Sequence, residues 1–381
     1  MRVAYLSHTG LVSGAERSLL AILAELPDSV SPRVISPPGP FRRQVEELGI
    51  PTTEVRGMEA GLRMHPVHAA RAAGQLVSSA LEVRRFCARE RIELVHANSI
   101  RAGLIAAMAR RLGAPPALVT IHDCLPPGRS AALISRVIRR QSAVVVANSR
   151  YTADSFGGAH VRVIHPAVRL EPPPRRSMGA ELRAELGIPA DTFVAAVVAQ
   201  ITPWKGQETA IRAMARVVRE LPEAALLLAG EAKFVGSSRR YDNVAYLEHL
   251  RSLTDRLGLS GAVRFLGERE DVSAIVSAAD VLLAPSWEEP FGMAIVEAML
   301  AGTPPIATSI GGPPEIIDDG RSGVIVEPRR AEPWAEAILR LAGDAATRES
   351  MGQAASQAAL RYSPKSRVAQ TLTAYEVALR G

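Results

Sequence analysis

Cysteine is nearly absent from this sequence, and the two that occur, Cys87 and Cys124, lie far apart. Two isolated cysteines provide neither a disulfide framework nor the clustered thiolates of a metal site, so a reducing cytoplasm is the expected compartment. Long apolar runs are missing as well, and the N-terminal stretch MRVAYLSHTG turns polar after a few residues. We therefore expect neither a secretion signal nor a membrane-spanning segment.

Several functional motifs are missing too. Aromatic residues amount to only 4% and do not alternate with basic ones, which disfavours single-stranded nucleic-acid binding. The sequence lacks the G-x-G-x-x-G fingerprint of dinucleotide-dependent dehydrogenases and the G-x-S-x-G elbow of serine hydrolases. No H-x-x-x-H, D-x-D or cysteine cluster occurs. We predict no nucleic-acid partner, no metal ligands and no required divalent cation.

Basic residues are plentiful but unevenly placed. Residues 1–170 contain 22 arginines and 12 acidic residues, a net charge of +10, whereas the remainder has a net charge of −4. A basic first half suggests an acidic acceptor or an anionic membrane surface, although an Arg-rich solvated surface explains the same pattern. Only Lys205, Lys233 and Lys365 are lysines among 45 basic residues, so each lysine is a candidate for a specific role.

The chain has 381 residues, which exceeds the length that a single hydrophobic core usually supports. Apolar runs alternate with amphipathic ones in both halves. This rhythm predicts an α/β fold with two parallel sheets, each covered by helices, and a cleft between two domains. We place the domains at 1–170 and 179–363, with a proline-rich linker at 171–178 between them. A helix over 364–381 could pack on either domain, including back on the first.

In open parallel sheets, ligands bind beyond the carboxyl ends of the strands. The richest such loop follows ADVLLAPS and precedes a helix predicted over 291–300. The free amides of Phe291, Gly292 and Met293 could bind an anionic or hydroxylated ligand. Glu289 and Glu297 could accept hydrogen bonds from sugar hydroxyls, or could simply complement the helix dipole or lie in solvent.

Other loops of the second half carry further candidates. Lys205, in QITPWKGQE, lies between a strand and a helix, where its ammonium could reach phosphates, although an exposed loop lysine is the alternative. Gly311 and Gly312 follow strand PIATS and could form a second backbone cradle or a plain tight turn.

In the first half, Gly14 in SGAE would allow close backbone approach to a phosphate. His122, at the end of VTIHDC, could hydrogen-bond a sugar, and Asp123 could orient it or cap a turn. His96 and Asn98 in LVHANS have the same ambiguity with less support.

Several segments together resemble glycosyltransferase family 4: SGAE, VTIHD, ITPWKGQ and FLGEREDVSAIVSAADVLLAPSWEEPFGMAIVEAMLAGTPPIATSIGGPPEIIDDGRSG. The most specific feature is the pair of glutamates within EPFG…EAM. The resemblance implies the GT-B fold, with two Rossmann-like domains facing across a cleft, and a metal-independent retaining hexosyltransferase. It also implies a nucleoside-diphosphate sugar donor, UDP- or GDP-linked, and no other cofactor. The product would be a glycan, a glycolipid or a glycosylated metabolite.

The resemblance also implies roles by position. Glu289 would contact the donor hexose together with the amides of Phe291, Gly292 and Met293, and Glu297 would hold the ribose. Lys205 would hold the diphosphate. The remaining implied site residues are the phosphate- or acceptor-contacting Gly14, the sugar-contacting His122, and Arg264 and Leu266 beside the base. Catalysis would come from Glu289, Lys205 and His122.

One position departs from the family pattern. Gln200 occupies the place of an arginine usually found five residues before the lysine. It could bind the donor by donating a hydrogen bond to a phosphate, but one positive charge for the leaving group is missing. A sugar-nucleotide epimerase and a catalytically degenerate sugar-nucleotide sensor are the alternative functions. The basic first half further suggests an anionic, lipid-linked acceptor, reached by a cytoplasmic protein at the inner face of the membrane.

Overall fold

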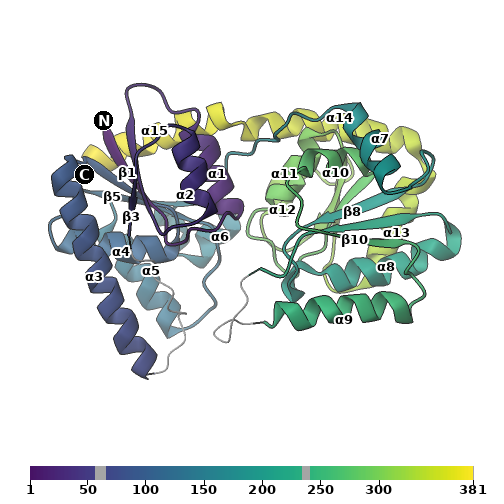
Figure 1. The fold of residues 1–381 in the computed structure, drawn as a ribbon, viewed down its shortest axis with the longest axis horizontal. Coiled ribbons are helices and arrows are strands. Elements are labelled where there is room, and N and C mark those ends of the chain that lie inside the picture. Colours follow the sequence, from purple (N-terminus) through teal and green to yellow (C-terminus); the bar gives the residue numbers. More distant parts are fainter. Residues whose placement is uncertain (56–65, 234–240, 381) are drawn as a thin grey trace. The chain divides into compact units, whose positions relative to one another are not determined.

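The computed structural model describes residues 1–55, 66–233 and 241–380 and divides the chain into two compact units (Figure 1). Unit 1 comprises Met1–Val168 and Tyr362–Gly381, and unit 2 comprises Arg169–Arg361. The chain therefore leaves unit 1 after Val168 and returns to it at Tyr362. The predicted class, α/β with two parallel sheets, is confirmed.

Unit 1 contains a parallel sheet of seven strands in the order β3-β2-β1-β4-β5-β6-β7. Its strands are β1 (Arg2–Leu6), β2 (Ser31–Ser36), β3 (Thr52–Glu54), β4 (Leu94–Ala97), β5 (Ala117–Ile121), β6 (Val144–Ala147) and β7 (Arg162–Val163). Its helices are α1 (Gly14–Leu23), α2 (Pro40–Glu47), α3 (Pro66–Glu90), α4 (Ile100–Arg111), α5 (Arg129–Gln141), α6 (Arg150–Ser155) and α15 (Pro364–Arg380).

The two faces of this sheet bury different helices. Val3 and Tyr5 pack with residues of α1, α2 and α15, whereas Ala4 and Leu6 pack with residues of α3, α4 and α5. Successive side chains of a strand point to opposite faces, so these apolar strands are covered on both sides.

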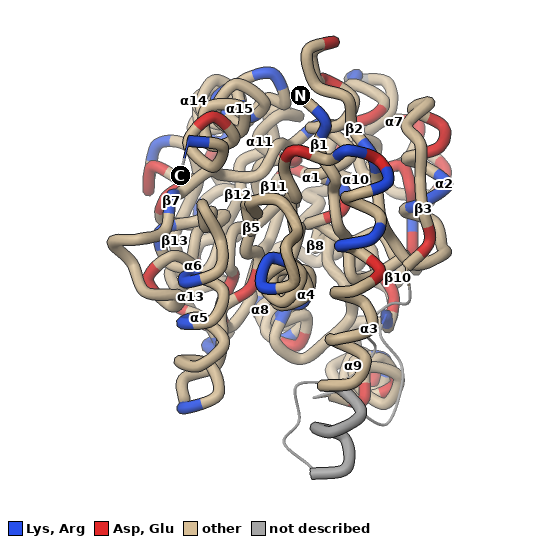
Figure 2. The backbone as a smooth tube through the Cα atoms, turned by 90° about the vertical axis from the view of Figure 1, so that its left-hand side faces the viewer, with Lys and Arg blue, Asp and Glu red and all other residues tan. Residues whose placement is uncertain are grey.

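The layer of α3, α4 and α5 is strongly basic. Helices α4 and α5 contain seven arginines and no acidic residue. Figure 2 colours basic residues blue along both helices. Five of these arginines are exposed: Arg110, Arg111, Arg129, Arg136 and Arg140. Leu133 on α5 is also 60% exposed. We call this surface the α4–α5 basic face.

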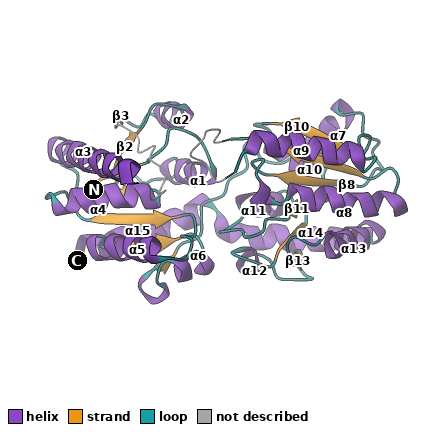
Figure 3. Cartoon of the chain, turned by 90° about the horizontal axis from the view of Figure 1, so that it is seen from below, coloured by secondary structure: helices purple, strands orange, loops and turns teal. Residues whose placement is uncertain are grey.

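Unit 2 contains a parallel sheet of six strands in the order β10-β9-β8-β11-β12-β13 (Figure 3). Its strands are β8 (Val194–Val198), β9 (Ala225–Ala229), β10 (Val263–Gly267), β11 (Val281–Ala284), β12 (Pro305–Thr308) and β13 (Val324–Val326). Its helices are α7 (Arg176–Glu185), α8 (Gln207–Glu220), α9 (Asn243–Arg256), α10 (Val272–Ala278), α11 (Met293–Leu300), α12 (Pro313–Ile316), α13 (Ala331–Gly343) and α14 (Ala345–Ala359).

Three details differ from the sequence-based expectation. Strands β3, β7 and β13 were not predicted, since each has only two or three residues at a sheet edge. Helix α7 begins at Arg176, inside the stretch expected to be linker, because the prolines end at Pro174 and leave the following residues free to form a helix. Helix α11 begins at Met293 rather than Phe291.

Helix α15 joins the first unit through a buried polar contact. The Tyr375 hydroxyl lies 2.6 Å from Nδ1 of His96 on β4 and donates a hydrogen bond of 3.1 Å to the Tyr5 hydroxyl on β1. All three side chains are buried. Burial raises the pKa of Tyr375 well above its usual value, so its hydroxyl remains protonated. The last helix is therefore part of the core of unit 1.

The Tyr375→Phe variant tests this contact. It keeps the ring but deprives two buried partners of a hydrogen bond, which should destabilise unit 1 by about 1–3 kcal/mol. Hydrogen exchange of the β4 and β5 amides measures the change. Trp204, Trp287 and Trp334 all lie in unit 2, so the urea midpoint of tryptophan fluorescence should hardly move. Unchanged exchange in β4 would show that the contact contributes nothing.

Candidate functional site

Two charged side chains meet at the carboxyl edge of the unit 2 sheet. Lys205 ends the 3₁₀ turn Pro203–Lys205 after β8, and Glu289 follows β11. The Lys205 Nζ donates to Glu289 Oε2 at 2.6 Å, and the Ser286 hydroxyl donates to the same oxygen at 2.7 Å. The two side chains are only 18% and 10% exposed. The structure thus brings together two of the predicted catalytic residues, 84 positions apart.

The Lys205 ammonium also lies over an aromatic ring. Its Nζ is 4.2 Å from the centroid of the Trp204 indole, a cation–π distance. The Trp204 carbonyl accepts a backbone hydrogen bond of 2.8 Å from Trp287, in the loop that carries Glu289. The loops after β8 and β11 are therefore joined by backbone as well as by side chains.

The backbone of Glu289 is fixed by the loop after β12. The Glu289 amide donates to the Ile310 carbonyl at 3.1 Å, and the Glu289 carbonyl accepts from the Gly312 amide at 2.8 Å. Gly311 lies between them with φ +113°, and a Cβ there would come within 2.0 Å of the Glu289 carbonyl oxygen. The two glycines hold Glu289 in place. The predicted second cradle is corrected on this point, since the Gly312 amide is already bonded to protein.

The start of α11 also differs from the prediction. Gly292 is the left-handed residue before the helix, with φ +107°, and its carbonyl accepts from the Ile295 amide at 3.1 Å. Met293 is therefore the first helical residue, and Phe291 and Gly292 precede the helix. The binding role of these three amides stays a prediction. Phe291 is buried, and Glu297 is buried one turn inside.

The three remaining predicted residues of unit 2 lie at different positions along the strand direction of the sheet. Gln200 follows β8 at the carboxyl edge, where its carbonyl accepts from the Gln207 side chain at 2.8 Å. Arg264, by contrast, is level with Ala196 in the ladder, so its backbone lies four residues below Gln200, or about 13 Å. Leu266 lies two residues nearer the edge and packs against a core cluster. The backbone of Arg264 therefore lies away from the edge that carries Gln200, and the predicted contacts of Arg264 and Leu266 with the base stay a prediction.

At the carboxyl edge of the unit 1 sheet, Gly14 is the first residue of α1. Ser13 precedes it and forms a reciprocal cap with Glu16. The Glu16 carboxyl is buried, which raises its pKa despite the hydrogen bonds from Ser13. Gly14 is thus the first residue of a capped helix at this edge.

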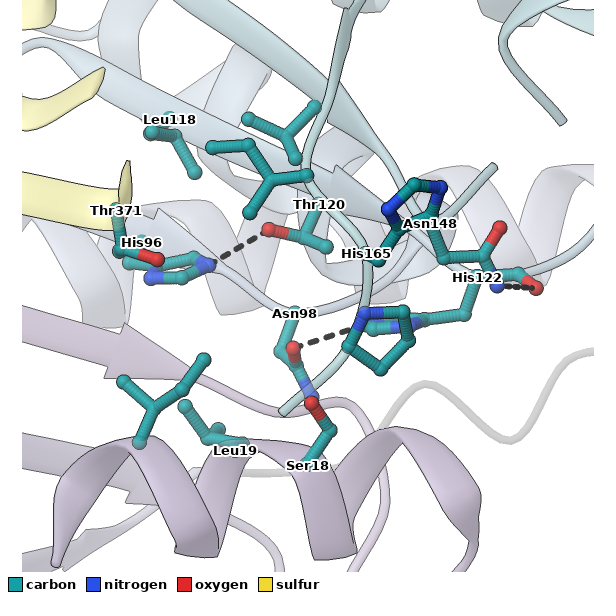
Figure 4. A pocket seen from close by; sticks show the side chains of 14 residues that line it. Ser18, Leu19, His96, Asn98, Leu118, Thr120, His122, Asn148, His165 and Thr371 are labelled. Carbon is teal, nitrogen blue, oxygen red and sulfur yellow. Dashed lines mark hydrogen bonds between the residues drawn. The ribbon is translucent and has the colours of Figure 1, made fainter. Parts of the chain in front are cut away.

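His122, directly after β5, lies on a small cavity of about 30 Å³ (Figure 4). Its Nε2 is 3.0 Å from Oδ1 of Asn98, and its carbonyl accepts from the Asn148 amide group at 2.8 Å. Desolvation, followed by the nearby His8, lowers the pKa of His122 to about 4. The imidazole is therefore neutral at physiological pH.

His96 and Asn98, the two candidates from LVHANS, have different surroundings. Both ring nitrogens of His96 are engaged, one by Tyr375 and the other by Thr120 Oγ1 at 2.8 Å. Burial lowers the pKa of His96 to about 3. It is a core histidine, while Asn98 reaches His122. Asn98 was a candidate from the sequence, but its contact with His122 was not predicted, and neither were the contacts of Ser286 and Tyr375, because each depends on residues distant in the chain.

In the described ranges, no group of three or more His, Cys, Asp or Glu is arranged to hold a metal ion. Nor does any described helix combine the length and apolarity needed to cross a membrane.

Comparisons with known proteins cover both units. Residues 12–172 match the family described as Glycosyltransferase Family 4, and residues 179–358 match the one described as Glycosyl transferases group 1. The D-inositol 3-phosphate glycosyltransferase of Nocardioides sp. is 30% identical over 333 residues, covering 79% of this chain and 71% of that protein. The protein of the same name from Saccharomonospora viridis is 32% identical over 299 residues, covering 71% and 67%.

Solved structures give the same result. Anabaena HepE in complex with UDP-glucose has a TM-score of 0.84 and 27% identity, covering 98% of this chain and 100% of that chain. WaaG, a glycosyltransferase involved in lipopolysaccharide biosynthesis, has a TM-score of 0.67 at 17% identity, covering 97% and 98%, and shows the same fold.

Replacing Gly311 by alanine tests how Glu289 is held. A Cβ at this left-handed position cannot fit against the Glu289 carbonyl, so the loop should shift and unit 2 should lose at least about 1–3 kcal/mol. The urea midpoint of tryptophan fluorescence reports unit 2. Gly343→Ala is the matched control, because nothing lies within 4 Å of its Cβ. Equal midpoints for both variants would contradict this role.

Proposed function

Because this chain belongs to glycosyltransferase family 4, the retaining GT-B enzymes that use nucleotide-sugar donors, we propose that it transfers a hexosyl residue from a UDP-linked sugar to an acceptor hydroxyl. The observation that carries this proposal is the buried pairing of Lys205 with Glu289 at the carboxyl edge of the unit 2 sheet. UDP is preferred over GDP as the carrier because HepE, at 27% identity, was solved with UDP-glucose.

The pair offers each end of a sugar nucleotide a complementary group. The Lys205 ammonium would bind the diphosphate, and the Glu289 carboxylate would accept hydrogen bonds from hexose hydroxyls. Each substrate contact replaces one half of the present ion pair, so neither charge is left buried without a partner. Glu297, on the same helix, would hold the ribose hydroxyls, and Leu266 at the end of β10 would border the base.

The chemistry needs no covalent nucleophile from the protein. The bond from the anomeric carbon to the diphosphate oxygen breaks, and the acceptor oxygen bonds to the same face of that carbon. A phosphate oxygen of the departing diphosphate takes the acceptor's proton. Lys205 stabilises the charge on that leaving group, helped by the amide of Met293 at the start of α11. Gln200 can donate a hydrogen bond but adds no charge, so Lys205 provides most of the stabilisation of the leaving diphosphate.

An anionic acceptor fits unit 1 best. The curated relatives named above act, by name, on a phosphate-bearing acceptor, D-inositol 3-phosphate. Unit 1 contains the seven arginines of α4 and α5 without a single acidic residue on those helices. Such a field attracts anionic acceptors over long range and also suits contact with the anionic inner face of a membrane. A lipid-linked acceptor would combine both properties.

Alanine at Lys205 or at Glu289 should reduce transfer about 10²–10³-fold while the fold persists, since each removes one charge that contacts the donor. UDP release and glycoside formation from UDP-glucose measure the effect. Lys365→Ala, at the exposed start of α15, is the matched lysine control. Wild-type rates in both site variants would overturn the assignment. Conversion of the donor to an epimer without acceptor would indicate an epimerase, and tight donor binding without turnover would indicate a sensor.

Membrane contact is tested by reversing charge on the α4–α5 basic face. Arginine gains about 1 kcal/mol near an anionic surface, so the double variant Arg136→Glu, Arg140→Glu should bind phosphatidylserine-containing vesicles at least about tenfold more weakly at low salt. Arg330→Glu, Arg340→Glu makes the same change in charge on unit 2 and should bind like wild type. If wild-type protein is not retained by these vesicles at low salt, the membrane proposal fails.

A further inference from the structure

Asn98 bridges two functional segments of unit 1. It follows β4, and its Nδ2 donates to the carbonyl of Ala15 in the first turn of α1 at 3.3 Å. Its Oδ1 lies 3.0 Å from Nε2 of His122 (Figure 4). The side chain is buried, with a residue exposure of 3%. One amide group thus links the turn that contains Gly14 to the imidazole at the end of β5.

These two contacts settle which atoms carry hydrogen. A backbone carbonyl can only accept, so the Asn98 atom that faces Ala15 must be the NH₂ group. Its oxygen therefore faces His122, and since that oxygen also only accepts, the ring nitrogen opposite it must carry a proton. In a neutral imidazole the other nitrogen, Nδ1, then has a lone pair and no hydrogen.

The surroundings keep this imidazole neutral. Its titratable neighbours are His8 from the loop after β1, His96 on β4 and His165 after β7, with Asp123 next in the chain and Glu16 in the first turn of α1. Burial disfavours the imidazolium most, and the like charge of His8 adds to this effect, so the pKa of His122 falls to about 4. The Asn98 side chain is neutral and adds no charge that would reverse this.

We propose that Asn98 is a positioning residue that holds the proton of His122 on Nε2, so that His122 meets the substrate as a hydrogen-bond acceptor for a hydroxyl group. The inference rests on the transferase function proposed above. A lone pair at Nδ1 accepts from a sugar hydroxyl but repels the oxygens of a carboxylate or a phosphate, which have no hydrogen to donate. Asn98 thereby makes this position selective for hydroxyl groups and prevents His122 from acting as a proton donor.

The first test needs no activity. In the full chain labelled with ¹⁵N-histidine, long-range proton–nitrogen correlation distinguishes a protonated ring nitrogen from one with a lone pair. Comparison with His122→Gln assigns the signal. We expect protonated Nε2 and bare Nδ1 at pH 7. A proton on Nδ1, or an imidazolium at pH 7, would overturn the proposal whether or not the protein transfers sugar.

The second test replaces Asn98 by aspartate. A carboxylate beside His122 favours the imidazolium, so the acid limb of kcat/KM for UDP release from UDP-glucose should move up from near pH 4 by about 1–3 units. Below the new pKa, Nδ1 carries a proton and can no longer accept from a hydroxyl. Asn98→Leu should slow the reaction about tenfold without moving the limb, because it removes orientation but adds no charge.

Ser149→Asp is the matched control. It adds the same charge after β6, the strand that pairs with β5. It also preserves a helix cap, since Ser149 is the N-cap of α6 and aspartate caps equally well. Its acid limb should remain near that of wild type. An unshifted limb in Asn98→Asp, or an equal shift in Ser149→Asp, would show that contact between residue 98 and His122 does not set the protonation of the ring.

Discussion

The ion pair between Lys205 and Glu289 is the contact on which the proposed site depends. Pairing two charges that are more than four-fifths buried rarely stabilises a protein by itself, because desolvation offsets the attraction. Two further contacts offset this desolvation. Ser286 donates to the same carboxylate oxygen, and backbone hydrogen bonds hold Glu289 to the loop after β12. The loops after β8 and β11 thus bind the Glu289 carboxylate, and the loop after β12 binds its backbone. A buried and preformed pair of charges suits a site that binds a diphosphate and sugar hydroxyls.

The candidate site of unit 1, at its own sheet edge, is held by neutral groups instead of an ion pair. Its candidate group is neutral, and its precision comes from hydrogen bonds rather than from charge: Asn98 links His122 to α1, and Asn148 holds the His122 carbonyl. The charge of unit 1 lies instead on the outer surface of α4 and α5. Neutral recognition at the edge and a basic outer layer together suit an acceptor that offers a hydroxyl for reaction and carries an anionic group elsewhere.

The sequence predicted most of the fold because its long strands are continuous apolar runs, such as ALVTI at β5 and ALLLA at β9. It missed β3, β7 and β13, whose two or three residues carry too little pattern. Lys205 and Glu289 were predicted singly, but their contact joins residues 84 positions apart and depends on how β8 and β11 are placed in the sheet. The start of α11 was placed two residues early, since the left-handed conformation of Gly292 is a tertiary property. The contacts of Asn98 and Tyr375 were not predicted, because their partners are distant in the chain.

The most direct test of the account is the melting temperature of the wild-type protein against UDP, GDP, ADP and dTDP sugars, with the free sugars as controls. A ligand that binds only the native state raises the melting temperature. At a concentration 100 times its Kd, it adds about 2.7 kcal/mol to the free energy of unfolding. The account predicts that a UDP-sugar stabilises the protein, UDP does so less, and glucose alone does not. If no nucleotide sugar shifts the transition, the assignment of Lys205 and Glu289 to a donor site is contradicted.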